Sequence, residues 1–180
     1  MKGLVIPEKV KNIIKKFAEN KAEIYIVGGA CRDLLLGREV NDWDFTTNLP
    51  PEKMKKLFSK NSFYNNNFGT LSILGKDDEI FEVTTFRTER GYSDGRHPDE
   101  VKWGKSLKED LERRDFTINA IAIDFKPTLP SLKKGGFSTD NFKIIDLFKG
   151  QKDLEKKLIR TVGNPDDRFK EDALRLIRAV

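Results

Sequence analysis

The hydrophobic pattern begins with a helical repeat from Pro7 to about Asn20. Apolar residues recur there three or four positions apart, with lysines on the opposite face: Val10, Ile13, Ile14 and Phe17. This spacing predicts an amphipathic helix. A short apolar run over 24–27 then leads into two glycines at 28–29, and residues 30–36 return to a helical pattern that Gly37 closes. We therefore expect a strand, a glycine turn and a short helix, in that order.

Further short apolar runs continue the pattern, with helical stretches between several of them. They lie at Phe45, Leu71–Leu74, Ile80–Val83, Ile118–Ile123 and Ile144-Ile145. Strands alternating with helices predict the fold class α/β (α+β), a mixed β-sheet with flanking helices. The polar segments Glu89–Glu100 and Pro127–Phe137 have no usable periodicity, so we expect surface loops there, the first of them mobile.

The pattern changes again near the end of the sequence. From Asp167 onward apolar residues return to helical spacing: Phe169, Ala173, Leu174, Ile177 and Val180. Because the repeat is still running at the last residue, it predicts one helix and a chain cut short within it. We therefore divide the sequence into one domain over residues 1–150 and the beginning of a second, helical domain over 151–180.

Composition narrows the class of protein. Of the 180 residues, 37% are hydrophobic and 35% are charged, which is typical of a folded globular protein. No apolar run approaches the roughly 20 residues of a membrane span, and a signal-peptide pattern is lacking, so we expect a cytoplasmic protein with no membrane partner. Cys31 and His97 are the only cysteine and histidine, which excludes an internal disulfide and a Cys/His zinc site. The net charge of +5 fits a polyanionic partner, but a lysine-rich solvated surface explains it equally well.

Two carboxylates flank a tryptophan in Asp42-Trp43-Asp44. In a strand the side chains of residues i and i+2 project from the same face, so these carboxylates would converge. Hard divalent cations such as Mg²⁺ prefer oxygen ligands of this kind, together with the phosphates of a substrate. Taken alone, an Asp-x-Asp is more often a solvated turn with a capping role.

Other residues near this pair fit a nucleotide. Gly28-Gly29 would let a phosphate approach the backbone N–H groups at the start of a helix, and Arg32 in the next turn could add a charge-assisted contact. Glu82 lies inside the apolar run Ile80–Val83, where an ionised carboxylate is costly unless it is paired or faces a metal. It is a candidate third ligand, and an outward-facing acid on a half-exposed strand is an equal alternative.

The order of these motifs resembles a known family. Gly28-Gly29, followed by Asp42–Phe45 and later by Phe81–Val83, looks like the polymerase-β-type nucleotidyltransferase signature. Three longer segments resemble successive motifs of class II tRNA nucleotidyltransferases, the CCA-adding and A-adding enzymes, and of bacterial poly(A) polymerases: Ile26–Asp33, Arg113–Ala120 and Glu171–Arg175. The resemblance runs from about Ile24 to Val180, and Cys31 stands where the family usually has valine.

The resemblance implies a nucleotidyltransferase catalytic head over residues 1–150 and the start of a helical neck over 151–180. Asp42 and Asp44 would bind two Mg²⁺ ions, one activating the RNA 3′-hydroxyl and the other neutralising the triphosphate. Glu82 is the further catalytic candidate. Phosphoryl transfer of this kind depends on positioning and charge stabilisation, so it needs no Ser/His nucleophile pair.

The same resemblance assigns residues to the nucleotide. Gly28, Gly29 and Arg32 would contact it, and Arg114 would contact its phosphates or sugar. Asn119 is a weaker candidate for the sugar. Without the motif, Arg114 would be interpreted as part of an exposed basic helix end.

A further set lies on the last predicted helix. Asp172, Arg175 and Arg178 fall at i, i+3 and i+6, so on one helix they would share a face. In the family a carboxylate and a guanidinium at these positions match the edges of adenine and cytosine and replace a template base. The commoner use of such spacing is a surface salt bridge.

The resemblance therefore implies template-independent transfer of CMP and AMP, from CTP and ATP, to the 3′ end of tRNA. The segment Tyr92–Pro98 resembles the flexible loop that helps the site accept ATP, which disfavours an enzyme that adds only C. His97 is then a loop residue rather than a general base. A poly(A) polymerase is the alternative among enzymes, and a non-catalytic nucleotide- or RNA-binding module is the alternative of another class.

Overall fold

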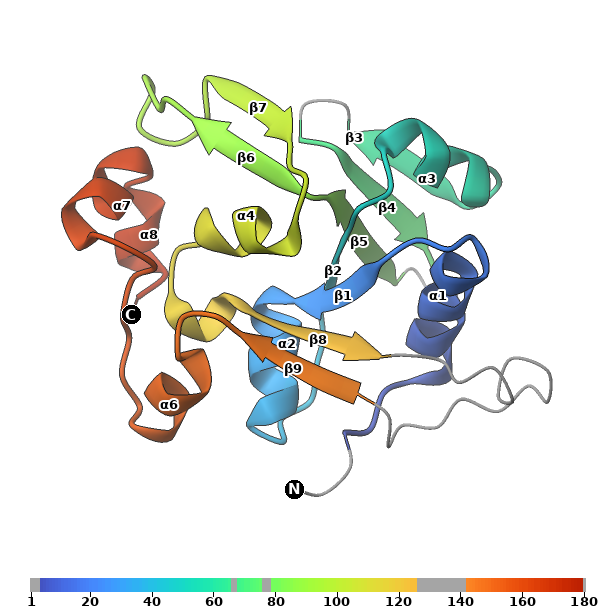
Figure 1. Cartoon of the computed structure of the whole chain (residues 1–180), viewed down its shortest axis with the longest axis horizontal. Helices are drawn as coiled ribbons and strands as arrows, with labels where there is room; N and C mark the ends of the chain where they lie inside the picture. Colours follow the sequence, from blue (N-terminus) through green and yellow to red (C-terminus); the bar gives the residue numbers. More distant parts are fainter. Residues whose placement is uncertain (1–3, 66–67, 76–78, 126–141, 180) are drawn as a thin grey trace.

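The computed structural model describes residues 4–65, 68–75, 79–125 and 142–179 (Figure 1). The strands in these ranges are β1 (Ile24–Val27), β2 (Trp43–Thr47), β3 (Ser62–Asn65), β4 (Thr70–Leu74), β5 (Ile80–Thr85), β6 (Arg87–Arg90), β7 (Glu100–Trp103), β8 (Ile121–Phe125) and β9 (Phe142–Asp146). Seven of them form one sheet in the order β3-β4-β5-β2-β1-β8-β9, and β6 pairs with β7 in a separate ribbon. Because β2 and β5 run parallel while the other neighbours in the large sheet run antiparallel, the sheet is mixed, as predicted.

The helices flank this sheet. They are α1 (Glu8–Glu19), α2 (Gly28–Leu35), α3 (Pro51–Leu57), α4 (Leu107–Glu112), the 3₁₀ helix η1 (Thr117–Asn119), α6 (Gly150–Glu155), α7 (Pro165–Glu171) and α8 (Leu174–Ile177). Figure 1 shows α7 and α8 beside the turn that joins β6 to β7, with α4 between them and the large sheet. No helix in the described ranges is long and apolar enough to cross a membrane.

The core lies between the large sheet and its helices. The predicted apolar stripe of α1 is buried there in full: Val10, Ile13, Ile14 and Phe17. Strand β2 contributes Trp43 and Phe45, which pack with residues of β1, β4, β5 and β8 in one hydrophobic cluster. Fully burying a side chain of this size stabilises the fold by about 1.5–3 kcal/mol. The apolar face of β2 therefore holds the strand in place independently of its polar residues.

The predicted glycine turn between β1 and the next helix is wrong. Gly28 and Gly29 are instead the first two residues of α2, which follows β1 directly. The φ angle of +69° at Gly28 changes the chain direction within a single residue, so no separate turn is needed. Gly37, with φ +66°, ends this helical segment as expected.

The loop predicted over Glu89–Glu100 is wrong at both ends. Arg90 of β6 pairs with Glu100 of β7, and the ribbon continues to Arg87 opposite Trp103. Charged side chains fill most of these positions, so the strands carry no alternation of apolar and polar residues. The prediction for Pro127–Phe137 lies outside the described residues.

The single C-terminal helix is also wrong. Asp172 has an extended backbone, with φ −146° and ψ 109°, and separates α7 from α8. Its side chain accepts a hydrogen bond from the backbone N–H of Leu174, which gives the chain a local alternative to helix continuation. The apolar residues Leu174, Leu176 and Ile177 of α8 are exposed rather than packed.

Candidate active site

A cavity of about 570 Å³ lies at the N-terminal end of α2. Its lining comes from β2 and α2, from Phe68, from β6 and the turn that follows it, from η1 and the segment between it and α4, and from α8 with Asp172 and Arg178 on either side of it. The predicted site residues that line it are Gly28, Gly29, Arg32, Asp42, Asp44, Arg114, Asn119, Asp172, Arg175 and Arg178. Residues predicted from separate motifs are thus gathered around one space.

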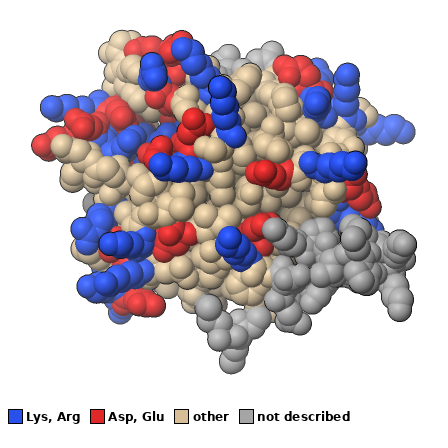
Figure 2. Space-filling view, in the orientation of Figure 1, with Lys and Arg blue, Asp and Glu red and all other residues tan. Residues whose placement is uncertain are grey.

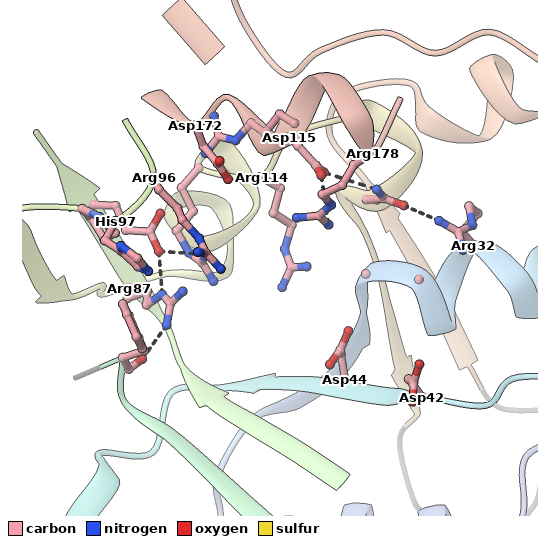
Figure 3. A pocket seen from close by; sticks show the side chains of 18 of the residues that line it. Arg32, Asp42, Asp44, Arg87, Arg96, His97, Arg114, Asp115, Asp172 and Arg178 are labelled. Carbon is pink, nitrogen blue, oxygen red and sulfur yellow. Dashed lines mark hydrogen bonds and ion pairs between the residues drawn. The ribbon is translucent and has the colours of Figure 1, made fainter. Parts of the chain in front are cut away.

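The two predicted carboxylates lie at the start of β2. Asp42 immediately precedes the strand and is exposed, whereas Asp44 lies within it, opposite Val27 of β1 and Glu82 of β5. Both line the cavity, and Figure 3 shows them on the same side of it. The convergence expected from i and i+2 spacing therefore exists, although only Asp44 belongs to the strand.

Electrostatics at Asp44 favour a cation. Burial raises the pKa of its carboxyl above the ordinary value, Arg114 opposes this shift, and the charges of Glu82 and Asp42 add to it. A carboxylate crowded by two others is stabilised by a positive ion, and oxygen ligands of this kind suit a hard divalent metal. Asp42 and Asp44 therefore fit such an ion.

Glu82 occupies a different position from this pair. It is exposed on β5 beside Asp44, and it is not among the residues that line the cavity. Within the described ranges, no group of three or more His, Cys, Asp or Glu side chains is arranged to hold a metal ion. The role of Glu82 as a third ligand stays a prediction.

The N-terminus of α2 approaches Asp44 closely. A Cβ atom added to Gly28 would lie 3.0 Å from the Asp44 Oδ2 atom and 3.3 Å from an Arg114 guanidinium nitrogen. Val27, which precedes the helix, makes no side-chain cap, so the first N–H groups of α2 are available to an anion. The position therefore requires glycine and offers a phosphate site next to the carboxylates.

Arg114 faces this phosphate site from the other direction. Its Nη2 atom donates to the buried carboxylate of Asp110 at 3.2 Å, while its buried Nε has no hydrogen-bond partner among the residues that the structure describes. Figure 3 places the guanidinium across the cavity from Asp44. A charged donor group held in this way can bind a phosphate or sugar oxygen.

The arginines of this region are held by a network of ion pairs. Asp110, whose side chain is 0% exposed, accepts hydrogen bonds from both Arg113 and Arg114. Glu89 contacts Arg87 at 2.8 Å and Arg113 at 3.0 Å, and it accepts a hydrogen bond from the Tyr92 hydroxyl. Burial and the neighbouring charge of Arg113 lower the pKa of Arg87 to about 10. Buried charges are tolerated only when they are paired in this manner.

Sequence analysis missed several of these residues as parts of the site. Arg87, Glu89 and Asp110 carry no motif of their own, and Phe68 lies in a segment for which nothing was predicted. The i, i+3 and i+4 spacing of Asp110, Arg113 and Arg114 was the one available signal, because such residues share a helix face.

A second chain of contacts crosses the cavity near α8. Asp115 forms an ion pair with Arg178 at 3.0 Å and accepts hydrogen bonds from its own neighbour Phe116 and from Asn119. The side-chain Oδ1 atom of Asn119 in turn accepts a hydrogen bond from Arg32, which also contacts Asp33. Arg32 and Asn119 are therefore held together at one rim of the cavity.

The proposed base-recognition residues meet at the cavity, but not through a shared helix face. Asp172 precedes α8, Arg175 is buried within it, and Arg178 follows it with its side chain 61% exposed. Arg175 donates to Glu171 and to the Arg168 carbonyl, and its guanidinium lies 5.9 Å from the centroid of the Tyr92 ring. The prediction of one face at i, i+3 and i+6 is wrong because the helix breaks at Asp172. All three still line the same space.

The turn over residues 91–99 is ordered by its own side chains. Asp94 accepts hydrogen bonds from the backbone N–H groups of Arg96 and His97, and Asp99 accepts from Ser93. Hydrogen bonds from His97 and Arg96 lower the pKa of Asp94 to about 2. The turn also contacts α8, since the Ala173 N–H donates to the Gly95 carbonyl at 3.2 Å. It therefore connects the ribbon to residues 172–178, the predicted base-recognition segment.

Comparison with known proteins identifies relatives of this arrangement. The family described as the poly A polymerase head domain matches residues 24–160. A CCA-adding enzyme from Staphylococcus saprophyticus is 42% identical over 96% of this chain and 39% of its own length. One from Enterococcus faecalis is 44% identical over 100% of this chain and 41% of its own. The chain thus spans about two fifths of the length of the curated relatives it matches.

Solved structures give the same result. The CCA-adding enzyme of Bacillus stearothermophilus in complex with CTP superposes with a TM-score of 0.76 at 38% identity, covering 97% of this chain and 38% of that one. The Thermotoga maritima CCA-adding enzyme complexed with tRNA gives a TM-score of 0.67 at 28% identity, with 97% and 37% covered. The predicted fold and the family resemblance are confirmed.

Proposed function

Because the chain belongs to the poly(A) polymerase head domain family, we propose that its cavity is the nucleotidyl-transfer site of an enzyme that adds C and A to the 3′ end of tRNA. The observation that carries this proposal is the meeting of four kinds of group around one space: the carboxylates of Asp42 and Asp44, a helix that begins with two glycines, the guanidinium of Arg114, and an Asp/Arg pair. The names of the CTP- and tRNA-bound structures that this chain resembles support the same substrates.

The carboxylates supply the metal site of the reaction. Asp42 and Asp44 would hold divalent ions, and we propose Mg²⁺ because the ligands are oxygen atoms and the substrate is a triphosphate. When bound there, such an ion would polarise the 3′-hydroxyl of the RNA and neutralise charge on the triphosphate. The 3′-hydroxyl gives up its proton to solvent as its oxygen forms a bond to the α-phosphorus of the nucleotide, the bond from that phosphorus to the leaving oxygen breaks, and pyrophosphate departs.

The protein's own groups position the triphosphate. The N–H groups that open α2 at Gly28 and Gly29 face the same space as the guanidinium groups of Arg32 and Arg114. These groups can hold the phosphates in line with the carboxylates. Positioning of this kind accounts for much of the rate enhancement in phosphoryl transfer, because the chemistry needs little else from the protein.

Base choice falls to Asp172 and Arg175. A carboxylate accepts hydrogen bonds and a guanidinium donates them, so together they can match the edge of adenine or cytosine. A base whose edge leaves either group unpaired loses about 1–3 kcal/mol per buried group. On this proposal the head of residues 1–150 is not sufficient, since the base-recognition groups come from residues 151–180.

The test is an incorporation assay on tRNA that lacks its terminal CCA. Each labelled nucleotide is supplied singly and in pairs with Mg²⁺, and Asp42→Ala is compared with the parent. Sequential addition of two C and one A, abolished by the substitution, is the expected result. Addition of A alone after a pre-existing CC would indicate an A-adding enzyme, and long A tails would indicate a poly(A) polymerase. Failure of every nucleotide to be incorporated by the folded protein would contradict the proposal and favour a non-catalytic binding module.

A further inference from the structure

The only histidine of the sequence has no part in the chemistry proposed above. His97 lies in the turn between β6 and β7 and lines the cavity, with 52% of its side chain exposed. Figure 3 shows it across the space from Asp42 and Asp44, so it is badly placed to exchange a proton with a reacting group there. A half-exposed imidazole ring that lines the proposed nucleotide site therefore needs another explanation.

The His97 ring is held in a fixed orientation. Its Nδ1 atom lies 2.8 Å from Asp94 Oδ2, and its backbone N–H donates to Asp94 Oδ1 at 2.7 Å. Because the Asp94 carboxylate is ionised and can only accept, Nδ1 carries the proton of this hydrogen bond. The ring also stacks on Phe68, with centroids 6.3 Å apart and planes inclined by 27°. A side chain already ordered by two partners loses little further entropy when a ligand binds it.

Phe68 is itself held in place by Arg87. The Arg87 guanidinium lies 5.5 Å from the Phe68 ring centroid and donates to the Phe68 carbonyl at 2.6 Å. Arg87 is in turn paired with Glu89. The Phe68 ring is therefore engaged by both Arg87 and His97, whereas 52% of the His97 side chain stays exposed and lines the cavity.

We propose that His97 is a stacking platform for a nucleobase, with Phe68 and Asp94 as the residues that position it. The inference rests on the proposed function, because it needs a nucleotide in this cavity. The turn that carries His97 contacts the base-recognition segment through Gly95 and Ala173. Hydrogen bonds to Asp172 and Arg175 would fix the edge of a base but leave its flat surfaces uncovered, and an aromatic ring covers such a surface for any of the four bases.

Two bases enter the reaction, and both offer the same chemistry. One belongs to the incoming nucleotide, and the other is the terminal base of the RNA. Stacking of either one contributes to binding in the ground state and in the transition state alike. Loss of the ring should therefore raise the KM of the stacked substrate and leave kcat nearly unchanged.

Two substitutions separate the ring from the hydrogen bond. His97→Asn keeps a donor for Asp94 but removes the ring, whereas His97→Phe keeps a ring and removes the donor. Phe63→Leu serves as a matched control, because Phe63 is an exposed aromatic residue on β3 that does not line the cavity. We expect His97→Asn to raise one KM about five- to thirtyfold, and His97→Phe to stay within about twofold of the parent.

A binding measurement tests the same point without catalysis. The Kd of the protein for an acceptor RNA is measured beside that for the same RNA ending in an abasic ribonucleotide, and the Kd for ATP beside that for ribose 5-triphosphate. If the RNA base stacks on His97, His97→Asn weakens binding of the intact RNA about five- to thirtyfold and changes binding of the abasic RNA by less than about twofold. If the incoming base stacks there, this difference is found in the ATP pair instead.

The proposal is overturned if His97→Asn weakens neither base-bearing ligand more than its base-free counterpart, or if His97→Phe behaves like His97→Asn. The second result would mean that the hydrogen bond to Asp94 matters and the ring does not. A parent protein that binds ATP and RNA but transfers no nucleotide would contradict the proposed function alone, since the stacking comparison needs only binding.

Discussion

The two sides of the cavity are held in shape by different interactions. The side that carries Asp42 and Asp44 is the start of a central strand, with β1 and β5 paired on either side of it and buried apolar residues beneath. The side that carries the arginines consists of a two-stranded ribbon and short helices, and ion pairs connect them. Backbone pairing and apolar packing hold the first side, the sheet wall, in shape. Charge pairing holds the second side, the arginine wall, in shape.

Because of this difference, the residues proposed to act in the reaction are not the ones that stabilise the sheet wall, whereas on the arginine wall the same residues do both. On the sheet wall, the charged groups can be changed while the backbone ladder and the core remain. On the arginine wall, Glu89 and Asp110 hold arginines of the cavity in place and also neutralise their partly or fully buried charges. Substitutions should therefore damage activity alone on the first wall, and activity together with stability on the second.

The largest effect is expected for Asp44→Asn on the sheet wall. Because we propose that Asp44 holds a metal ion, removing its carboxylate should lower the rate of nucleotide transfer by about a thousandfold or more. The melting temperature should not fall, because burial already raises the pKa of this carboxyl and so makes its ionised form costly. Incorporation assays and thermal unfolding of the same preparation check both parts. A variant that unfolds early would show that this wall also depends on its charges.

Next in size is Asp110→Asn on the arginine wall. This change leaves Arg113 and Arg114 without their buried counter-charge, so we expect the free energy of unfolding to fall by about 3 kcal/mol. Chemical denaturation at pH 7 measures the loss. Glu112→Gln on the same helix is the control, since Glu112 makes only a surface pair with Lys108 and should change stability by less than about 0.5 kcal/mol.

At acidic pH the difference in the free energy of unfolding between Asp110→Asn and the parent protein should become smaller. Burial alone would raise the pKa of Asp110, but Arg113 and Arg114 outweigh it and lower the pKa below its ordinary value. The carboxylate therefore stabilises the fold at pH values above the unfolded pKa of about 4, and this contribution is lost as the pH falls from there through the folded pKa. A stability gap that stayed constant down to low pH would contradict the assignment.

A smaller effect is expected for Gly28→Ala, where α2 meets the sheet wall. The added Cβ would lie 3.0 Å from Asp44 Oδ2, on a backbone whose φ of +69° disfavours side chains. We expect a loss of about 1–2 kcal/mol in stability, together with weaker nucleotide binding, measured by denaturation and calorimetry. Gly37→Ala is the matched control, because its φ of +66° carries the same backbone cost while a Cβ there meets nothing within 4 Å. If both variants bind nucleotide equally, the close approach at Gly28 is unimportant.

The smallest change in stability should follow Arg178→Ala. Its ion pair with Asp115 is 3.0 Å long, but the arginine side chain is 61% exposed, so solvent screens the attraction. We expect a loss below about 0.5 kcal/mol that disappears in high salt, measured by thermal unfolding over a salt series. A larger loss would place Arg178 among the structural charges of the arginine wall.

Much of the sheet wall could be predicted from the sequence. The apolar runs of β1 and β5, the stripe of α1 and the pair Asp42/Asp44 follow from local spacing, because period and burial are recorded residue by residue. The family resemblance added the correct fold and pointed to Arg114, Asp172 and Arg175, which do line the cavity, but it also pointed to Glu82, which does not.

The arginine wall could not be predicted in the same way. Its strands are charged and show no alternation, and its contacts join residues far apart in the sequence, such as Glu89 with Arg113. The break at Asp172 was hidden because apolar residues keep helical spacing on both sides of it, while a side-chain hydrogen bond decides the local conformation. Periodicity reports which residues tend to be buried, and it does not report which charges meet.

The central position of β2 has a consequence for how often each side of the cavity opens, and so for how fast its backbone amides exchange with solvent. Amide protons of a strand paired on both sides exchange with solvent only through large openings, whereas those of a two-stranded ribbon are released by small ones. We therefore expect the amides around Phe45 to outlast those of β6 and β7 in deuterium by orders of magnitude. Asp42 and Asp44, at the start of β2, would then keep their place through many openings and closings of the ribbon on the other side of the cavity.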